Sequence, residues 1–238
     1  MTKPSTSTAE LIRYQIQSQG ERYWRYCDFS SLSPTAVSKT LSRLSQEGFL
    51  RRVSKGLYYH PRQTRFGASR PSQSELQQVA LKHKLHPAGV SAANLLGFTT
   101  QNAVQGEFAT SATSVPSKLL HPRSKLYTRR PSTWDSLSAT EASLLDFLRN
   151  RGRWSELSPK QTKERLLEFF LNEERFAKLV KVAPFEPSRV QAMLGAIGQE
   201  LNHNQELLTK LRQGLNPLSR FDFGILGSLD YAQEWQGK

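Results

Sequence analysis

The apolar residues between positions 34 and 61 follow a helical spacing first and a strand-like spacing afterwards. The first three recur at i, i+4 and i+7, on one face of an amphipathic helix: Val37, Leu41 and Leu44. Pro34 suits the first turn of this helix, and Gly48 suits its end, because glycine adopts a left-handed C-cap conformation without steric cost. The spacing then predicts two short strands and a turn between them, over residues 49–50, 57–59 and 53–56.

The residues before this segment predict three more elements. A helix is expected over residues 8–19, with an apolar stripe that includes Leu11, Ile12 and Ile16, and Gly20 ends it. Residues 22–26 predict a short strand that pairs with the later hairpin, and residues 28–32 predict a short helix. The resulting order of elements is helix, strand, helix, helix and hairpin, which is that of a winged helix-turn-helix. This order makes double-stranded DNA the first candidate partner.

Polar and basic residues cover the remaining faces of this segment. Base recognition in a major groove needs side-chain donors, and we expect four residues of the helix to reach base edges: Thr35, Ser38, Lys39 and Arg43. Two serines are expected to fix the helix on the DNA backbone: Ser33 and Ser42. Basic residues of the hairpin and beyond are expected to hold phosphates or enter the minor groove: Arg51, Arg52, Lys55, Arg62 and Arg65. The alternative is an ordinary helix and hairpin with a solvated basic face.

The rest of the chain predicts a second domain. Residues 60–73 are polar, with prolines and arginines, and predict a linker or an extended arm. Helices are expected over residues 72–84 and 89–96, and short strands over residues 104–110, 117–120 and 125–128. Five further helices are expected over residues 138–150, 158–170, 172–181, 187–201 and 205–213. Ser138 and Glu141 form the sequence pattern of a capping box at the first of these five.

The predicted fold class is therefore α+β. A winged helix-turn-helix DNA-binding domain is expected over residues 1–71, followed by a C-terminal domain over residues 72–238. That second domain would hold helices and a small β-sheet over residues 72–134 and a helical bundle over residues 135–238.

Charge is distributed unevenly over the 238 residues, whose net charge is +13. Residues 1–70 hold 12 Lys and Arg against 4 Asp and Glu, whereas residues 132–238 hold 14 of each. The excess of Lys and Arg in the first part of the chain favours a surface that neutralises the phosphates of a nucleic acid. A surface charge that only keeps the protein in solution is the simpler alternative. The one cysteine, Cys27, excludes an intrachain disulfide and fits a reducing compartment. No apolar run approaches the roughly 20 residues that span a bilayer, so we expect a cytoplasmic protein without a membrane partner.

Motifs for catalysis and for cofactor binding are missing from the sequence. There is no glycine-rich phosphate loop, no G-x-S-x-G and no H-E-x-x-H. His83 and His86 form an H-x-x-H, but Pro87 breaks a helix there and no cysteine or carboxylate pair accompanies them. We therefore expect no enzymatic activity, no metal and no cofactor. A nucleic-acid-processing enzyme stays an alternative, because sites assembled from distant residues leave no local motif.

Two segments in order resemble a known family. The first, residues 36–61, is AVSKTLSRLSQEGFLRRVSKGLYYHP, and it resembles the winged helix of AbiEi-type antitoxins, with their A-V-x-x-x-L-S-R-L, small basic loop and R-x-x-x-G-x-Y. The second, residues 86–114, resembles the start of that family's C-terminal domain: HPAGVSAANLLGFTTQNAVQGEFATSATS. The run LYTRRPS, residues 126–132, resembles the strand that closes its small sheet. The likeness covers roughly residues 9–131 and is general beyond them.

This resemblance implies a transcriptional autorepressor and antitoxin, one half of a two-gene toxin–antitoxin system of the phage-defence type. It implies that the N-terminal domain represses its operon by binding inverted repeats in double-stranded DNA. It also implies that the C-terminal domain counters a nucleotidyltransferase-like toxin. Two alternatives to this function are a stand-alone winged-helix transcription regulator and a protein-interaction module without antitoxin activity.

Overall fold

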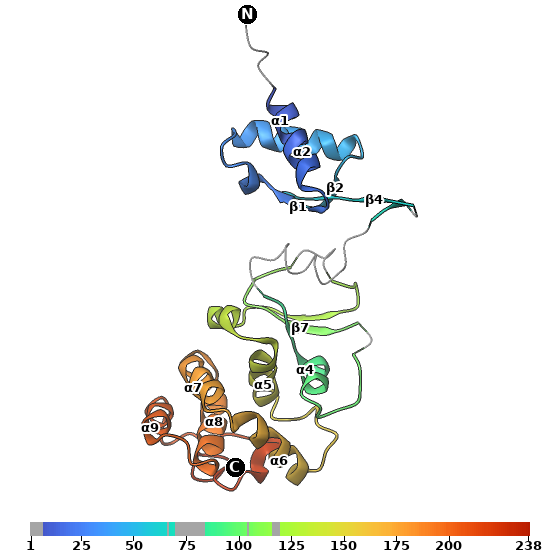
Figure 1. The fold of residues 1–238 in the computed structure, drawn as a ribbon. Coiled ribbons are helices and arrows are strands. Elements are labelled where there is room, and N and C mark those ends of the chain that lie inside the picture. The colour runs from blue at the N-terminus through green and yellow to red at the C-terminus, as the bar shows by residue number, and fades with distance from the viewer. Residues whose placement is uncertain (1–6, 66, 70–83, 104, 116–119) are drawn as a thin grey trace, which may run out of the picture. The chain divides into compact units, whose positions relative to one another are not determined.

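The computed structural model describes residues 7–65, 67–69, 84–103, 105–115 and 120–238. The chain divides into two compact units, Met1–Lys82 with Val115–Pro122 and His83–Ser114 with Arg123–Lys238 (Figure 1). The predicted helix over residues 72–84 and the predicted strand over residues 117–120 lie outside the described residues, except for Lys84 and Leu120. The predicted domain boundary at residue 71 also falls there and stays a prediction. Each unit is described by itself.

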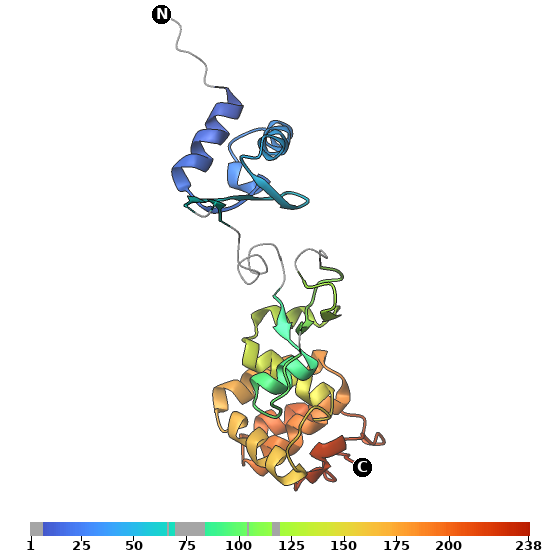
Figure 2. The same ribbon diagram turned by 90° about the vertical axis from the view of Figure 1, so that its right-hand side faces the viewer.

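The first unit places two helices on the same side of a three-stranded sheet (Figures 1 and 2). Strand β3 lies between the other two strands and pairs antiparallel with both. The elements in chain order are α1 (Thr8–Gln19), β1 (Arg22–Arg25), the 3₁₀ helix η1 (Tyr26–Phe29), α2 (Pro34–Gln46), β2 (Arg51–Ser54) and β3 (Leu57–His60). The predicted first helix, the predicted strand near residue 22 and its pairing with the hairpin are confirmed.

The core of the first unit joins the apolar faces of both helices to the sheet. Ile12 and Ile16 of α1 are fully buried, and the three residues predicted to line α2 are buried as well. The rings of Trp24 and Phe29 stack on each other in the same core, with centroids 5.2 Å apart. The buried cluster consists of Ile12, Ile16, Trp24, Phe29, Val37, Leu41, Leu44, Leu50 and Tyr58.

The short helix predicted over residues 28–32 is wrong in place and in kind. The structure has one turn of 3₁₀ helix there, η1, which ends at Phe29. The Asp28 carboxylate accepts a hydrogen bond from the backbone N–H of Arg25 at 2.6 Å. This side chain therefore closes the turn that precedes it and does not cap a helix that follows it.

The first strand of the hairpin begins two residues later than predicted. The backbone N–H groups of Phe49 and Leu50 both donate to the carbonyl oxygen of Leu44, at 3.0 and 3.1 Å. These two residues complete the end of α2, since the last carbonyls of a helix need partners. Strand β2 therefore starts at Arg51.

The segment predicted as a linker contains a small antiparallel hairpin formed by β4 (Gln63–Thr64) and β5 (Gly67–Ala68). Its base is closed by two hydrogen bonds of 2.9 Å: Arg62 N–H donates to the Ser69 hydroxyl, and Ser69 N–H donates to the Arg62 carbonyl. Residues 62–65 and 67–69 are therefore a structured extension of the first unit rather than a bare linker.

The second unit combines a small mixed sheet with a larger helical part. In the sheet, β7 (Glu107–Ala109) pairs antiparallel with β6 (His86–Pro87) and parallel with β8 (Lys125–Tyr127). The helices are α4 (Gly89–Leu95), α5 (Ala139–Arg149), α6 (Pro159–Phe170), α7 (Glu173–Val182), α8 (Ser188–Glu200) and α9 (Gln205–Gln213). The 3₁₀ turns are η3 (Ser132–Ser136), η4 (Ala183–Phe185) and η5 (Gly224–Ser228). The five helices predicted after residue 138 are confirmed.

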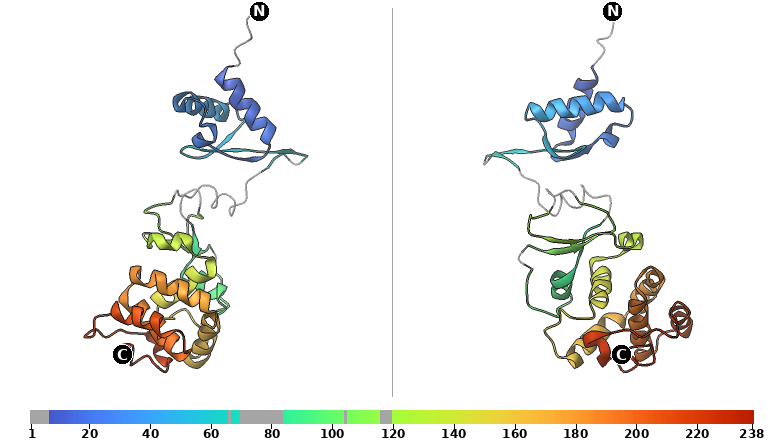
Figure 3. Two further views of the ribbon diagram at one scale, coloured as in Figure 1. Left: turned by 60° about the vertical axis from the view of Figure 1, so that its left-hand side comes forward. Right: turned by 180° about the vertical axis from the view of Figure 1, so that it is seen from behind.

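Two helices form the centre of the second unit, α5 and α8 (Figure 3). Each contains a run of residues that are buried on every side, from Glu141 to Leu148 and from Val190 to Gly198. The capping box of Ser138 and Glu141 forms as predicted. The molecule is thus of mixed α and β content with small sheets, in agreement with an α+β class. Within the residues described, no helix is both long and apolar enough to cross a bilayer.

Candidate nucleic-acid interface

Helix α2 turns one face into the core and the opposite face to solvent. Its buried residues are Val37, Thr40, Leu41 and Leu44. At 100° per residue, the centre of the opposite face is formed by Thr35, Lys39, Ser42 and Gln46. Ser38 and Arg43 lie on either side of that centre. The four residues predicted for base edges are therefore brought together on the solvent side of one helix, together with Ser42.

The residues at the two ends of α2 differ in whether their side chains already have a partner within the protein. Ser33 stands at the N-cap and is exposed, and its hydroxyl makes no hydrogen bond to the first turn. It can therefore meet an external acceptor beside the free N–H groups of that turn. At the other end, Arg43 lies 3.5 Å from the Glu47 carboxylate, which also binds Arg13. Arg43 is 59% exposed but already has a carboxylate partner.

The β2–β3 hairpin carries three of the predicted basic residues, and all three are exposed: Arg51, Arg52 and Lys55. Lys55 and Gly56 form its tip, where Gly56 has a φ of +79°. A Cβ on Gly56 would lie 2.8 Å from the ring of Tyr26, which packs against the tip. The Tyr26 ring also meets that of Tyr58 edge to face at 6.4 Å. Tyr26 thus positions the tip, a role that no local pattern in the sequence predicts.

The β4–β5 hairpin holds the last two predicted residues, Arg62 and Arg65, and both are exposed. Arg62 lies 3.9 Å from the Glu21 carboxylate, whereas no ion pair is found for Arg65 among the described residues. Hydrogen bonds from Ser69 and Tyr59 lower the pKa of Glu21. The Tyr59 hydroxyl also lies 3.0 Å from that of Ser69, so this cluster fixes the base of the hairpin to β3.

The predicted cations of the first unit therefore fall into two groups. Arg43 and Arg62 each have a carboxylate within 4 Å. Within the described part of the chain, five others have no such partner: Lys39, Arg51, Arg52, Lys55 and Arg65. These five can bind an external group without first breaking an internal ion pair, and the four of them on the hairpins are the stronger candidates for phosphate contact.

The second unit holds a buried network of charged groups. The Asp146 carboxylate is 1% exposed and accepts hydrogen bonds from Gly89 N–H at 2.7 Å, Arg130 at 2.8 Å and Asn150 at 2.9 Å. Burial raises the pKa of Asp146, and the Gly89 N–H and the positive charges of Arg130 and Arg149 oppose that effect. The Arg130 guanidinium lies over the Trp134 ring, 5.3 Å from its centroid. The network joins the sheet edge, η3 and α5, so its evident role is to hold them together.

A neighbouring pair extends this network. Buried Glu186 accepts a hydrogen bond from the Trp134 indole N–H at 2.7 Å and binds Arg149. His86 is also buried, and its Nε2 lies 3.0 Å from the Trp134 carbonyl oxygen. Burial lowers the pKa of His86. Within the residues that the structure describes, no group of three or more metal-ligating side chains is present.

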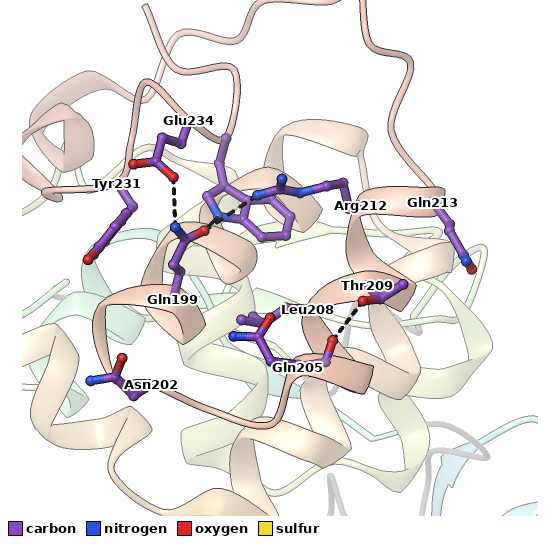
Figure 4. A pocket seen from close by; sticks show the side chains of 10 residues that line it. Gln199, Asn202, Gln205, Leu208, Thr209, Arg212, Gln213, Tyr231 and Glu234 are labelled. Carbon is purple, nitrogen blue, oxygen red and sulfur yellow. Dashed lines mark hydrogen bonds between the residues drawn. The ribbon is translucent and has the colours of Figure 1, made fainter.

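A polar pocket of about 640 Å³ lies between α8, α9 and the C-terminal segment (Figure 4). Gln199 forms its centre: its side chain donates to Glu234 at 2.7 Å and accepts from the Trp235 indole N–H at 2.6 Å. Arg212 covers the Trp235 ring at 4.6 Å from the centroid. These groups bond chiefly to one another, so they close the C-terminal segment onto the two helices.

Comparison with known proteins gives a family match over part of the chain and a distant structural likeness. Residues 23–117 match the model of a family that is described as a family of unknown function (DUF6088). No curated protein matches the chain. Among solved structures, the chain is similar to the crystal structure of the RV2827C protein from Mycobacterium tuberculosis, with 16% sequence identity and a TM-score of 0.42. That likeness covers 95% of this chain and 89% of the other.

Proposed function

We propose that the first unit is a winged helix that binds double-stranded DNA. In this proposal α2 enters the major groove, and the β2–β3 hairpin is the wing. Thr35, Ser38, Lys39 and Arg43 meet base edges, while Ser33 and Ser42 hold the backbone. The basic residues of the two hairpins neutralise phosphates. The protein acts through binding, and the proposal includes no catalytic step, cofactor or metal.

One observation carries this proposal: the polar face of α2 and the hairpin cations without carboxylate partners belong to the same compact unit. The opposite face of α2 is fully used by the core, so only the polar face is available to a partner. A protein surface with several cations and few carboxylates attracts polyanions by long-range forces. A donor-rich helix beside them is what recognition of bases additionally requires.

The proposal is tested by fluorescence anisotropy with the full-length protein and a duplex selected from a random library. Lys39→Ala should weaken binding to the selected duplex, because it removes the central cation of the polar face. Lys160→Ala is the matched control: Lys160 is an exposed lysine of the second unit, with 83% of its side chain exposed. Equal losses in the two variants, or tighter binding to single strands than to the duplex, would contradict the assignment.

The resemblance to AbiEi-type antitoxins supports a wider role, which we include in the proposal. The first unit would repress its own operon, and the second unit would counter a nucleotidyltransferase-like toxin from the adjacent gene. Co-expression with that toxin tests the division of roles. Residues 1–71 should retain DNA binding but fail to rescue growth, whereas the full chain should rescue it. Full rescue by residues 1–71 alone would refute the role assigned to the second unit.

A further inference from the structure

Helix α7 has an outward face whose two ends carry opposite charges. Its buried residues are Phe176, Leu179, Val180 and Val182. The opposite side carries exposed Glu173 and Glu174 in the first turn and exposed Lys181 in the last. Ala177 lies between them, a small residue at which a second helix could approach closely. No ion pair involves Glu173, Glu174 or Lys181 among the described residues.

An apolar groove adjoins the basic end of this face. It has a volume of about 360 Å³ and is lined by side chains of α7, η4 and α9, which include Val180, Pro184, Leu207 and Leu211. Two lysines stand at its rim, Lys181 and Lys210, and neither has an ion-pair partner within the described residues. An apolar side chain flanked by carboxylates would complement this groove in shape and in charge.

The acidic end of α7 presents that complement. Leu171 lies two residues before the helix and is 66% exposed, so its apolar side chain is available to a partner. Glu173 and Glu174, both exposed, follow it after Asn172, the N-cap residue of α7. The chain therefore carries an apolar anchor with two carboxylates at one end of α7, and a groove with two lysines at the other end.

The acidic end and the basic end of α7 also lie at matching positions for a contact between two copies of the chain. Leu171, just before α7, and Pro184, just after it, are equally many residues away from the middle of the helix, between Ala177 and Lys178. An antiparallel pair of α7 helices that cross at this point brings the segment before α7 of one copy, which holds Leu171, to the segment after α7 of the other, which holds Pro184. The same register places Glu174 opposite the other copy's Lys181. A two-fold axis repeats both contacts, as a closed dimer requires.

We propose that the outward face of α7 and its adjoining groove form a two-fold interface between two copies of this chain. Leu171 of each copy enters the groove of the other, and Glu173 and Glu174 pair with Lys181 and Lys210 across the axis. This interface is independent of the proposed DNA contacts, which all lie in the first unit. Its charge pairs make the dimer weaker at high salt, because exposed ion pairs are screened.

Analytical ultracentrifugation of the full-length protein, without DNA, tests the interface by charge reversal. One variant carries Lys181→Glu and Lys210→Glu, and a second carries Glu173→Lys and Glu174→Lys. Each alone places like charges across the axis, and its dimer dissociation constant should rise about tenfold or more. An equimolar mixture of the two variants should form a heterodimer at the native strength, since each reversed residue again faces an opposite charge across the axis.

A matched control reverses two exposed lysines elsewhere, Lys160→Glu with Lys238→Glu, and should dimerise as the native chain does. Circular dichroism and the thermal midpoint check that each variant folds. If one reversal misfolds, a single chain with all four reversals restores complementarity and keeps the test decisive. Three results would overturn the proposal: a native chain that stays monomeric at high micromolar concentration, self-association that ignores the reversals, or a mixture that stays monomeric.

Discussion

Replacement of Arg52 by alanine should change the salt dependence of DNA binding by a calculable amount. Four hairpin cations lack a carboxylate partner within the described residues: Arg51, Arg52, Lys55 and Arg65. If each neutralises one phosphate, the logarithm of the association constant should fall against the logarithm of salt concentration with a slope of about −3.6, at about −0.9 per contact. Without Arg52 the slope should be about −2.7.

These slopes predict a large and measurable difference. Between 50 and 200 mM salt, the native protein should lose about 150-fold in affinity and Arg52→Ala only about 40-fold. Anisotropy titrations at four or five salt concentrations measure both slopes. Arg62→Ala should change the slope less, because Arg62 already lies 3.9 Å from Glu21 and must exchange that partner for a phosphate. Lys160→Ala should leave the slope unchanged. An unchanged slope for Arg52→Ala would refute the assignment of the wing to the DNA backbone.

Three other predictions concern recognition and stability. Arg43→Ala should cost about 1–3 kcal/mol on a selected duplex and much less on random DNA, and equal losses in the two titrations would exclude a base contact. Asp146→Ala should lower the free energy of unfolding, measured in urea, by about 3–5 kcal/mol. The substitution leaves the Arg130 guanidinium and the Gly89 N–H without their buried acceptor. A loss below about 1 kcal/mol would contradict this role of Asp146. Burial lowers the pKa of His86 below its ordinary 6.5, so the unfolded state takes up the proton first on acidification. Stability should therefore fall as the pH drops below 6.5, and His86→Asn should flatten that dependence in urea titrations; an unchanged dependence would refute the role of His86.

The periodic spacing of apolar residues predicted those helices that bury one face. The spacing of Val37, Leu41 and Leu44 was sufficient to place α2 and, by exclusion, its polar face, because the helix buries one face only. The same logic failed at residues 28–32, where a side-chain hydrogen bond decides the local conformation. An aspartate before a polar run can cap a following helix or close a preceding turn, and sequence spacing does not distinguish the two.

Helix α5 shows a second limit. The helix expected over residues 138–150 has Leu144, Leu145 and Leu148 at the spacing of one apolar face, but the structure buries every residue from Glu141 to Leu148. Asp146 is buried because its partners come from positions 16 and 57 residues away. A buried carboxylate is stable only with such partners, and one sequence does not reveal contacts at that separation. For the same reason, the division of the basic residues into those with and without carboxylate partners required the structure.

The ratio of affinities for a selected and a scrambled duplex tests the central claim most directly. It should be measured for the full-length protein and for the variant that combines Lys39→Ala with Arg43→Ala. The native ratio should be about 10³ or more, as specific binders show. In the variant the ratio should collapse, while affinity for the scrambled duplex falls far less, because the hairpin cations remain. A native protein that binds every duplex equally, or a variant that keeps the native ratio, would contradict the proposed role of α2.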